Sequence, residues 1–164
     1  MESAIPRLPR PGDGGYPSGM GFMWADTLLA AERAHVIRLL VWGGGSVLVG
    51  TALFAWLHVG RRRSALLEHF GIQTAAWGMV DLVLGTIARA ALAPRDLAAA
   101  TRLDRLLWLN IGLDAGYAMV GLALVVLGWR LGRRLGLVGA GLAVVVQGIA
   151  LALLDLLLAS QISR

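Results

Sequence analysis

Four long apolar blocks dominate the pattern of hydrophobic and polar positions along the chain. A helix needs roughly 20 mainly apolar residues to cross the hydrocarbon core of a bilayer. The blocks that reach this length cover residues 36–58, 66–92, 106–129 and 136–159. We therefore expect an all-α integral membrane protein with four transmembrane helices.

The connections between the blocks predict how the helices are arranged. The first and last connections, "VGRRRSA" and "RLGRRLG", are short and rich in arginine, so each predicts a tight helical hairpin. The middle connection, "APRDLAAATRLDR", is longer, and its Pro94 is expected to end the second helix. The helices should therefore run up and down, with both termini and the middle connection on one side. We call this side the terminal face and the opposite side the hairpin face.

The residues before the first block are expected to lie outside the membrane. Residues 1–24 form a Pro/Gly-rich tail, residues 25–35 are expected to form a short interfacial helix, and residues 36–164 form the transmembrane domain. Such a tail has little to fold around by itself, so we expect it to bind a partner. The tail residues expected to do so are Pro6, Pro9, Pro11, Tyr16, Pro17, Phe22 and Trp24.

A weak internal repeat suggests that the two hairpins are related. Gln73 precedes Asp81 by the same interval that separates Gln147 from Asp155, and both glutamine and aspartate are rare in these blocks. The pattern fits two tandem hairpins. Trp56 also matches Trp129. Coincidence is an open alternative, because most of the other matching positions are abundant glycine and arginine.

Composition narrows the chemistry that is available. The chain is 57% hydrophobic, above the value of about 45–50% that is usual for soluble domains. It contains no cysteine and no lysine, which excludes thiolate metal sites, cysteine nucleophiles and Schiff-base lysines. Its positive charge lies at the ends of apolar blocks, where arginine meets lipid headgroups, so we expect no nucleic-acid partner.

A few polar residues interrupt the apolar blocks. Their helical spacing allows one polar stripe per helix to face a common axis, and all three aspartates fall in the half of the membrane nearer the terminal face. The predicted intramembrane polar network consists of Arg38, Gln73, Asp81, Asn110, Asp114, Tyr117, Gln147 and Asp155.

Asp81 is the most informative of these residues, because no arginine lies within seven positions of it. A charge in hydrocarbon costs several kcal/mol by most estimates, so the side chain should face protein or water. We expect hydrogen bonds to it from other helices, with Arg38 as the candidate counterion and Arg89 and Arg105 as shallower alternatives. The network either fixes the register of the helices or forms a proton or small-ligand site.

No catalytic or cofactor motif is visible, so we predict neither an enzyme nor a bound cofactor or metal. His35, His58 and His69 all fall at the ends of blocks, away from the middle of the membrane. Surface ligation of a pigment or haem by His58 or His69 is an open alternative.

Two functions fit this pattern. The first is a non-catalytic accessory subunit of a larger membrane assembly, such as a respiratory or photosynthetic complex, with other membrane subunits as partners. The alternative is a small proton- or solute-conducting protein that uses the intramembrane aspartates. We expect location in a bacterial inner membrane, with both termini in the cytoplasm.

Overall fold

The computed structural model describes residues 18–162, with side chains described from residue 23. This part of the chain forms four helices and no strand: α1 (Ser18–Val59), α2 (Ala65–Ala90), α3 (Leu97–Arg130) and α4 (Leu135–Ile162). All four are long and apolar enough to cross a membrane. The predicted four-helix, all-α membrane fold is confirmed.

The connection between α2 and α3 is shorter than the sequence pattern suggested. Helix α3 begins at Leu97, whereas we expected the third span to begin at residue 106. The Asp96 side chain caps the helix by accepting a hydrogen bond of 2.7 Å from the backbone N–H of Ala99. The alanine-rich segment that follows has high helix propensity, so the helix extends well before its apolar block.

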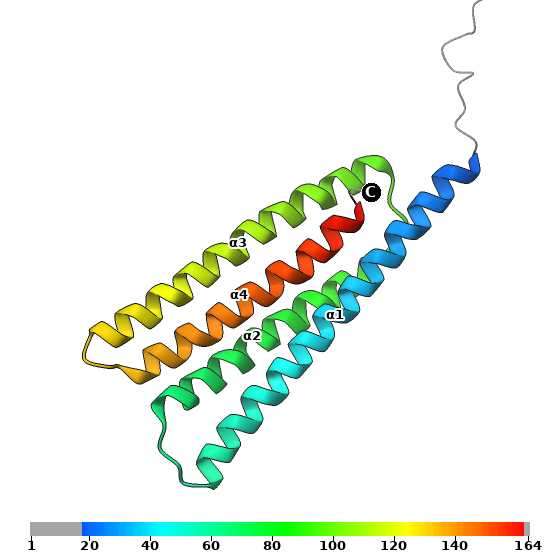
Figure 1. Cartoon of the computed structure of the whole chain (residues 1–164). Coiled ribbons are helices and arrows are strands. Elements are labelled where there is room, and N and C mark those ends of the chain that lie inside the picture. The colour runs from blue at the N-terminus through cyan, green and yellow to red at the C-terminus, as the bar shows by residue number, and fades with distance from the viewer. Residues whose placement is uncertain (1–17, 163–164) are drawn as a thin grey trace, which may run out of the picture.

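Helix α1 also starts earlier than expected and has no break. Residues 25–35 are helical, but they continue directly into the first span instead of forming a separate interfacial helix. No proline or glycine interrupts the chain between Trp24 and Trp42, so nothing ends the helix there. The 42 residues of α1 span about 63 Å, roughly twice the hydrocarbon thickness. Its first turns extend beyond the ends of the neighbouring helices (Figure 1).

Only part of the expected partner-binding tail can be compared with the structure. Pro6, Pro9, Pro11, Tyr16 and Pro17 lie outside the described residues. Phe22 belongs to α1, but its side chain is outside the described part. Trp24 is exposed on α1.

Glycines at intervals of seven residues bring the helices of each hairpin close together. In the α1–α2 hairpin, a Cβ added to Gly78 would lie 2.6 Å from the carbonyl oxygen of Gly43. In the α3–α4 hairpin, a Cβ added to Gly121 would lie 2.7 Å from the carbonyl oxygen of Gly141. A seven-residue spacing keeps small residues on one face of a slightly supercoiled helix, so the backbones approach along the whole hairpin.

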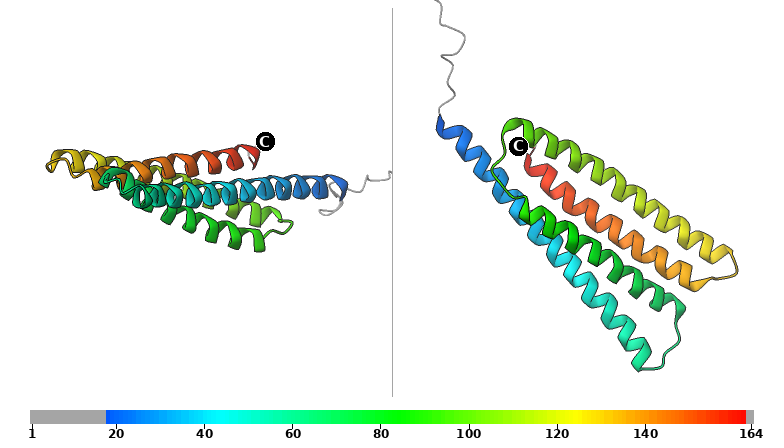
Figure 2. Two further views of the ribbon diagram at one scale, coloured as in Figure 1. Left: turned by 90° about the horizontal axis from the view of Figure 1, so that it is seen from below. Right: turned by 180° about the vertical axis from the view of Figure 1, so that it is seen from behind.

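The two hairpins meet through α4 and leave α3 at the edge. The helices lie side by side in the order α3, α4, α2, α1 (Figures 1 and 2), and α1 also touches α4. A Cβ on Gly139 of α4 would overlap the backbone of Leu66 on α2, so these helices are tightly packed. Among the described residues, no Cα atom of α3 comes within 8 Å of one in α1 or α2.

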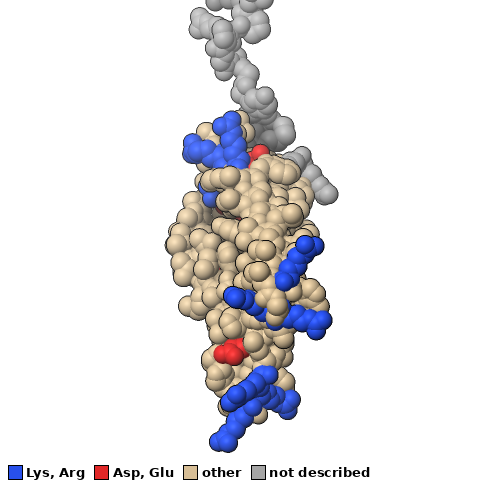
Figure 3. Space-filling model, turned by 90° about the vertical axis from the view of Figure 1, so that its left-hand side faces the viewer, with Lys and Arg blue, Asp and Glu red and all other residues tan. Residues whose placement is uncertain are grey.

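The two hairpin turns have similar local structures. Arg61 and Arg133 both have positive φ angles, of 49° and 58°. The Arg62 guanidinium lies 4.4 Å from the centre of the Trp56 ring, and that of Arg133 lies 5.3 Å from the Trp129 ring. These turns place arginines in groups at the hairpin face (Figure 3). The six arginines of the turns, all exposed, are Arg61, Arg62, Arg63, Arg130, Arg133 and Arg134.

Candidate functional site

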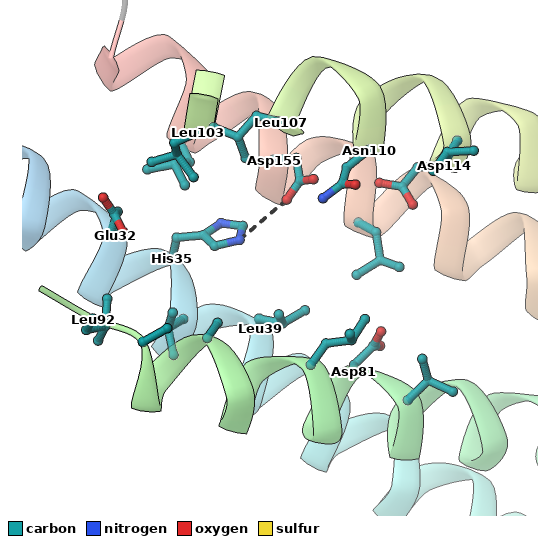
Figure 4. A pocket seen from close by; sticks show the side chains of 18 of the residues that line it. Glu32, His35, Leu39, Asp81, Leu92, Leu103, Leu107, Asn110, Asp114 and Asp155 are labelled. Atoms are coloured by element: carbon teal, nitrogen blue, oxygen red, sulfur yellow. Dashed lines mark ion pairs between the residues drawn. The ribbon is translucent and has the colours of Figure 1, made fainter. Parts of the chain in front are cut away.

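The separation of α2 from α3 leaves a cavity of about 470 Å³ inside the molecule. Residues of all four helices line it, together with Arg95 and its neighbours in the α2–α3 connection. Apolar side chains form most of its wall, and four carboxylates face it: Glu32, Asp81, Asp114 and Asp155. We call this space the acidic cavity (Figure 4).

Asp81 is the most deeply placed of these acids. Its side chain is completely buried, and neither carboxylate oxygen has a hydrogen-bond partner among the described residues. The position follows from helix spacing, because Asp81 is three residues after Gly78, where α2 touches α1, and four after Trp77, which lines the cavity. The side chain faces protein, as expected, but the expected hydrogen bonds are absent.

Asp155 has two polar neighbours across the cavity. The Nε2 atom of His35 lies 3.4 Å from its Oδ1 atom, and the Asn110 side chain donates a hydrogen bond to the carboxylate (Figure 4). The Nδ1 atom of His35 lies 3.2 Å from the backbone carbonyl of Leu154. A carbonyl only accepts hydrogen bonds, so Nδ1 carries a proton in this contact.

This arrangement limits the protonation states of the pair. With Nδ1 donating to Leu154, the contact between Nε2 and Asp155 becomes a hydrogen bond only if one further proton is present. That proton belongs either to the imidazole ring of His35 or to the carboxyl group of Asp155. The pair therefore offers two adjacent positions for one proton inside the acidic cavity.

Asp114 and Tyr117 extend the polar lining along α3. The Asp114 side chain is buried one helical turn from Asn110, and Gly148 of α4 leaves room for the α3 backbone beside it. The rings of Tyr117 and Trp77 meet edge to face, with centroids 5.2 Å apart. This aromatic pair spans the gap between α3 and α2.

An ion pair lies at the terminal end of the acidic cavity. Glu32 of α1 is only 4% exposed, and its Oε1 atom accepts a hydrogen bond of 2.6 Å from Nε of Arg95. This hydrogen bond raises the pKa of Arg95, so the guanidinium stays charged. The pair joins α1 to the α2–α3 connection.

The other predicted network residues do not face the acidic cavity. Gln147 forms a separate cluster on α4, where its Oε1 accepts a hydrogen bond of 2.5 Å from Trp42 and its Nε2 donates one of 3.2 Å to Ser46. Gln73 is half-buried and has no hydrogen bond to a described side chain. The eight predicted residues therefore form no single network.

Arg38 is not the counterion of Asp81. Its side chain is exposed on a second, largely apolar groove beside Trp42, and it forms no ion pair with a described acid. The reason is the rotation of α1, which turns Glu32, His35 and Leu39 toward the acidic cavity. Arg38 is rotated about 100° from Leu39 and faces outward.

His58 and His69 make local contacts at the hairpin face. His58 contacts the carbonyl of Phe54 at 3.0 Å, and His69 contacts that of Ala65 at 2.9 Å. The described residues contain no group of three potential metal ligands. Surface ligation of a pigment by either histidine stays a prediction.

Sequence reasoning missed Glu32, His35 and Arg95 as members of the site. Glu32 and His35 were assigned to a separate interfacial helix, and Arg95 to a long connection. A signal for Glu32 was present, because Glu32, Leu39 and Ser46 follow at intervals of seven along one helical face. Extending this face upstream would have placed Glu32 inside the bundle.

Comparison with protein families gives a match that covers most of the transmembrane domain. The chain belongs to a family of unknown function (DUF6992), whose model matches residues 38–156. The matched region contains Asp81, Asp114 and Asp155, whereas Glu32 and His35 precede it. No curated protein and no solved structure matches the chain.

Proposed function

We propose that this member of the family is a non-enzymatic membrane protein that takes up protons or a small solute in its acidic cavity. The observation that carries the proposal is Asp81, a fully buried carboxylate without a partner at the wall of a large cavity. Ionisable groups inside a membrane are costly, and they mark ion, proton or ligand pathways.

The size and composition of the acidic cavity support this role. Its volume of about 470 Å³ falls within the range of roughly 300–1,000 Å³ that is typical of small-molecule sites. Such sites combine apolar walls with a few convergent polar groups. A network that only fixed helix register would use its polar groups on each other, but Asp81 contacts no polar partner.

The shared proton position between His35 and Asp155 supports proton movement. From Asp81, the polar lining continues through Asp114 and Asp155 to His35, and then to Glu32 near the terminal face. Neighbouring groups that can each hold a proton form a relay when water joins them. We propose that the acidic cavity exchanges protons with the terminal face along this lining.

Reconstitution into lipid vesicles tests the proposal. With a pH-sensitive dye inside, vesicles that contain the protein should dissipate an imposed pH gradient faster than empty vesicles. Asp81→Asn should slow this flux by roughly tenfold or more, the effect of at least about 1.4 kcal/mol on the limiting step. Asp104→Asn is the matched control, because Asp104 lies on α3 but does not line the cavity. Equal flux from the wild-type protein and the Asp81→Asn variant would contradict the proposal.

An accessory subunit of a larger assembly is the second candidate function. The observation in its favour is that, among the described residues, α3 has close backbone contacts with α4 alone, while α1 extends beyond the other helices (Figure 1). Both surfaces could carry partner subunits of a respiratory or photosynthetic complex. Gentle detergent extraction followed by native mass spectrometry would show a stoichiometric complex if this function is correct, and the chain alone or its homo-oligomer if it is not.

We propose that the protein lies in a bacterial inner membrane with its terminal face toward the cytoplasm, and that it works without a bound cofactor. The basis for the orientation is the arginine count. The terminal face has Arg33, Arg38, Arg89 and the arginines of residues 95–105 close to the membrane.

A further inference from the structure

We propose that the solute of the acidic cavity is a lipophilic organic cation that enters sideways from the bilayer between α2 and α3. The inference rests on the proposed function, because it names the class of solute for the same site. Three features carry it: unpaired carboxylates, an aromatic pair at the gap and an opening toward lipid.

The charges inside the acidic cavity favour a positively charged solute. The arginine and the histidine that line the cavity each already contact an acid, because Arg95 pairs with Glu32 and His35 contacts Asp155. Asp81 and Asp114 have no cationic partner among the described residues. A positive group between these two acids would satisfy both, whereas an anion would enter a cavity with a carboxylate from each of the four helices.

The walls favour an apolar body attached to that charge. Leucine, valine and alanine side chains make up more than half of the lining, including Leu39, Leu107 and Leu151. A small hydrated cation would lose its water against these walls and gain only the contacts with the carboxylates in return. An organic cation buries apolar surface there and brings its charge to the carboxylates, which lowers the cost of desolvation.

Trp77 and Tyr117 add a contact that is specific for cations. Both side chains line the acidic cavity and meet edge to face, with ring centroids 5.2 Å apart. Aromatic faces attract organic cations, and tryptophan does so most strongly. The pair lies on the two helices that carry Asp81 and Asp114, one turn from each acid, so both kinds of contact can act on one ligand.

The same gap provides a route from the lipid phase. Val80 and Leu84 of α2 and Leu113 of α3 line the acidic cavity, and about half of each residue is exposed. Residues that face both the cavity and the surface mark an opening. Because α2 and α3 have no close backbone contact among the described residues, we place this opening between these two helices, both of which are long and apolar enough to cross a membrane. A lipophilic cation that has partitioned into the bilayer can reach it directly.

Two probes of the same shape and opposite charge test the inference. The full chain is placed in lipid nanodiscs, and the binding of tetraphenylphosphonium and of tetraphenylborate is measured by equilibrium dialysis, with subtraction of binding to empty nanodiscs. We expect saturable binding of tetraphenylphosphonium only. Equal binding of both ions, or no saturable binding of the phosphonium, would overturn the inference without the use of any variant.

Variants then locate the bound cation. Asp81→Asn should weaken tetraphenylphosphonium binding by roughly tenfold or more, and Trp77→Leu by roughly threefold to tenfold. Asp104→Asn and Trp108→Leu are the matched controls, because neither residue lines the acidic cavity. Circular dichroism and size-exclusion profiles establish that each variant is folded. If Asp81→Asn and Trp77→Leu both bind like the wild type, the inference is wrong.

The binding experiment and the flux experiment can reject the two proposals separately. Loss of proton flux in Asp81→Asn together with no phosphonium binding in the wild type would retain the proposed function and reject an organic cation as the solute. Absence of both effects would reject both proposals.

Discussion

At the scale of single residues, Asp81 combines complete burial with a lack of partners. A carboxylate placed only for stability would accept hydrogen bonds, as Asp155 does from Asn110. Asp81 accepts none from the described residues. Its presence therefore lowers stability, and such a cost is typical of positions selected for function.

Replacement of Asp81 by leucine should therefore stabilise the protein while it abolishes function. The unpartnered carboxylate is removed, no partner is left unpaired, and the neighbouring cavity accommodates the larger side chain. We expect the free energy of unfolding to rise by about 1–3 kcal/mol, within the range seen when buried charges are replaced by apolar groups. Thermal unfolding in detergent measures the change. A lower midpoint would mean that Asp81 has a structural partner.

Removal of a charge from the ion pair between Glu32 and Arg95 should lower the stability of the protein, because each member is hydrogen-bonded to the other. Arg95→Met leaves Glu32 buried without a partner, and we expect a loss of about 1–3 kcal/mol in the free energy of unfolding. Adding Glu32→Gln should recover much of this loss, since the unpaired charge is removed. Arg102→Met is the control on an exposed arginine. A similar loss in Arg102→Met would show that the effect is not due to the pair.

At the scale of helices, glycine positions determine which surfaces meet. Gly78 faces the α1 backbone, whereas a Cβ on Gly45 would meet nothing within 4 Å. Gly78→Ala should therefore lower the free energy of unfolding by about 1–3 kcal/mol through overpacking. Gly45→Ala should be neutral or stabilising by up to about 1 kcal/mol, because alanine is the better helix former. Thermal unfolding of both variants in one detergent makes the comparison, and equal shifts would contradict the packing described above.

Hydropathy predicts where the four helices cross the membrane. It predicts less well where each helix ends and which of its residues face the other helices. An apolar block marks where a helix crosses lipid, and α1 and α3 continue beyond their blocks because local propensity and the Asp96 cap maintain them in water. The series Gly71, Gly78, Gly85 was readable as a packing face. The pairing of His35 with Asp155 could not be predicted from the sequence, because it depends on how α1 is rotated against α4.

At the scale of the whole molecule, the asymmetric contacts of α3 create the site. A symmetric four-helix bundle would bring α2 and α3 together and fill the space between them. Here, among the described residues, only the backbone of α4 comes close to that of α3, so Asp81 and Asp114 remain on opposite sides of a cavity. The sequence identified all three intramembrane aspartates as candidates. It could not show that the space between them is open, because no local pattern encodes the distance between α2 and α3.

The distribution of arginine over the two faces gives a prediction for membrane orientation. By their order in the sequence, nine of the 15 arginines are assigned to the terminal face and six to the hairpin turns. Arginine near the membrane is retained on the cytoplasmic side, and acidic residues contribute little to this bias. We therefore expect the terminal face to be cytoplasmic. A green fluorescent protein fused after Arg164 should then be fluorescent, and alkaline phosphatase at the same position should be inactive.

The same reporter fusions on arginine variants test whether the arginines determine the orientation. The two faces differ by only three arginines, so the bias should be adjustable. Replacement of Arg33, Arg38 and Arg89 by glutamine removes the excess and leaves six arginines for each face. We expect a mixed population, with partial activity of both reporters, because topology follows the local arginine difference. The matched replacement of Arg61, Arg62 and Arg63 increases the excess and should leave the C-terminus fully cytoplasmic. Phosphatase activity in the unmodified protein, or an inverted response of the two triple variants, would place the acidic cavity's polar lining toward the outside of the cell instead.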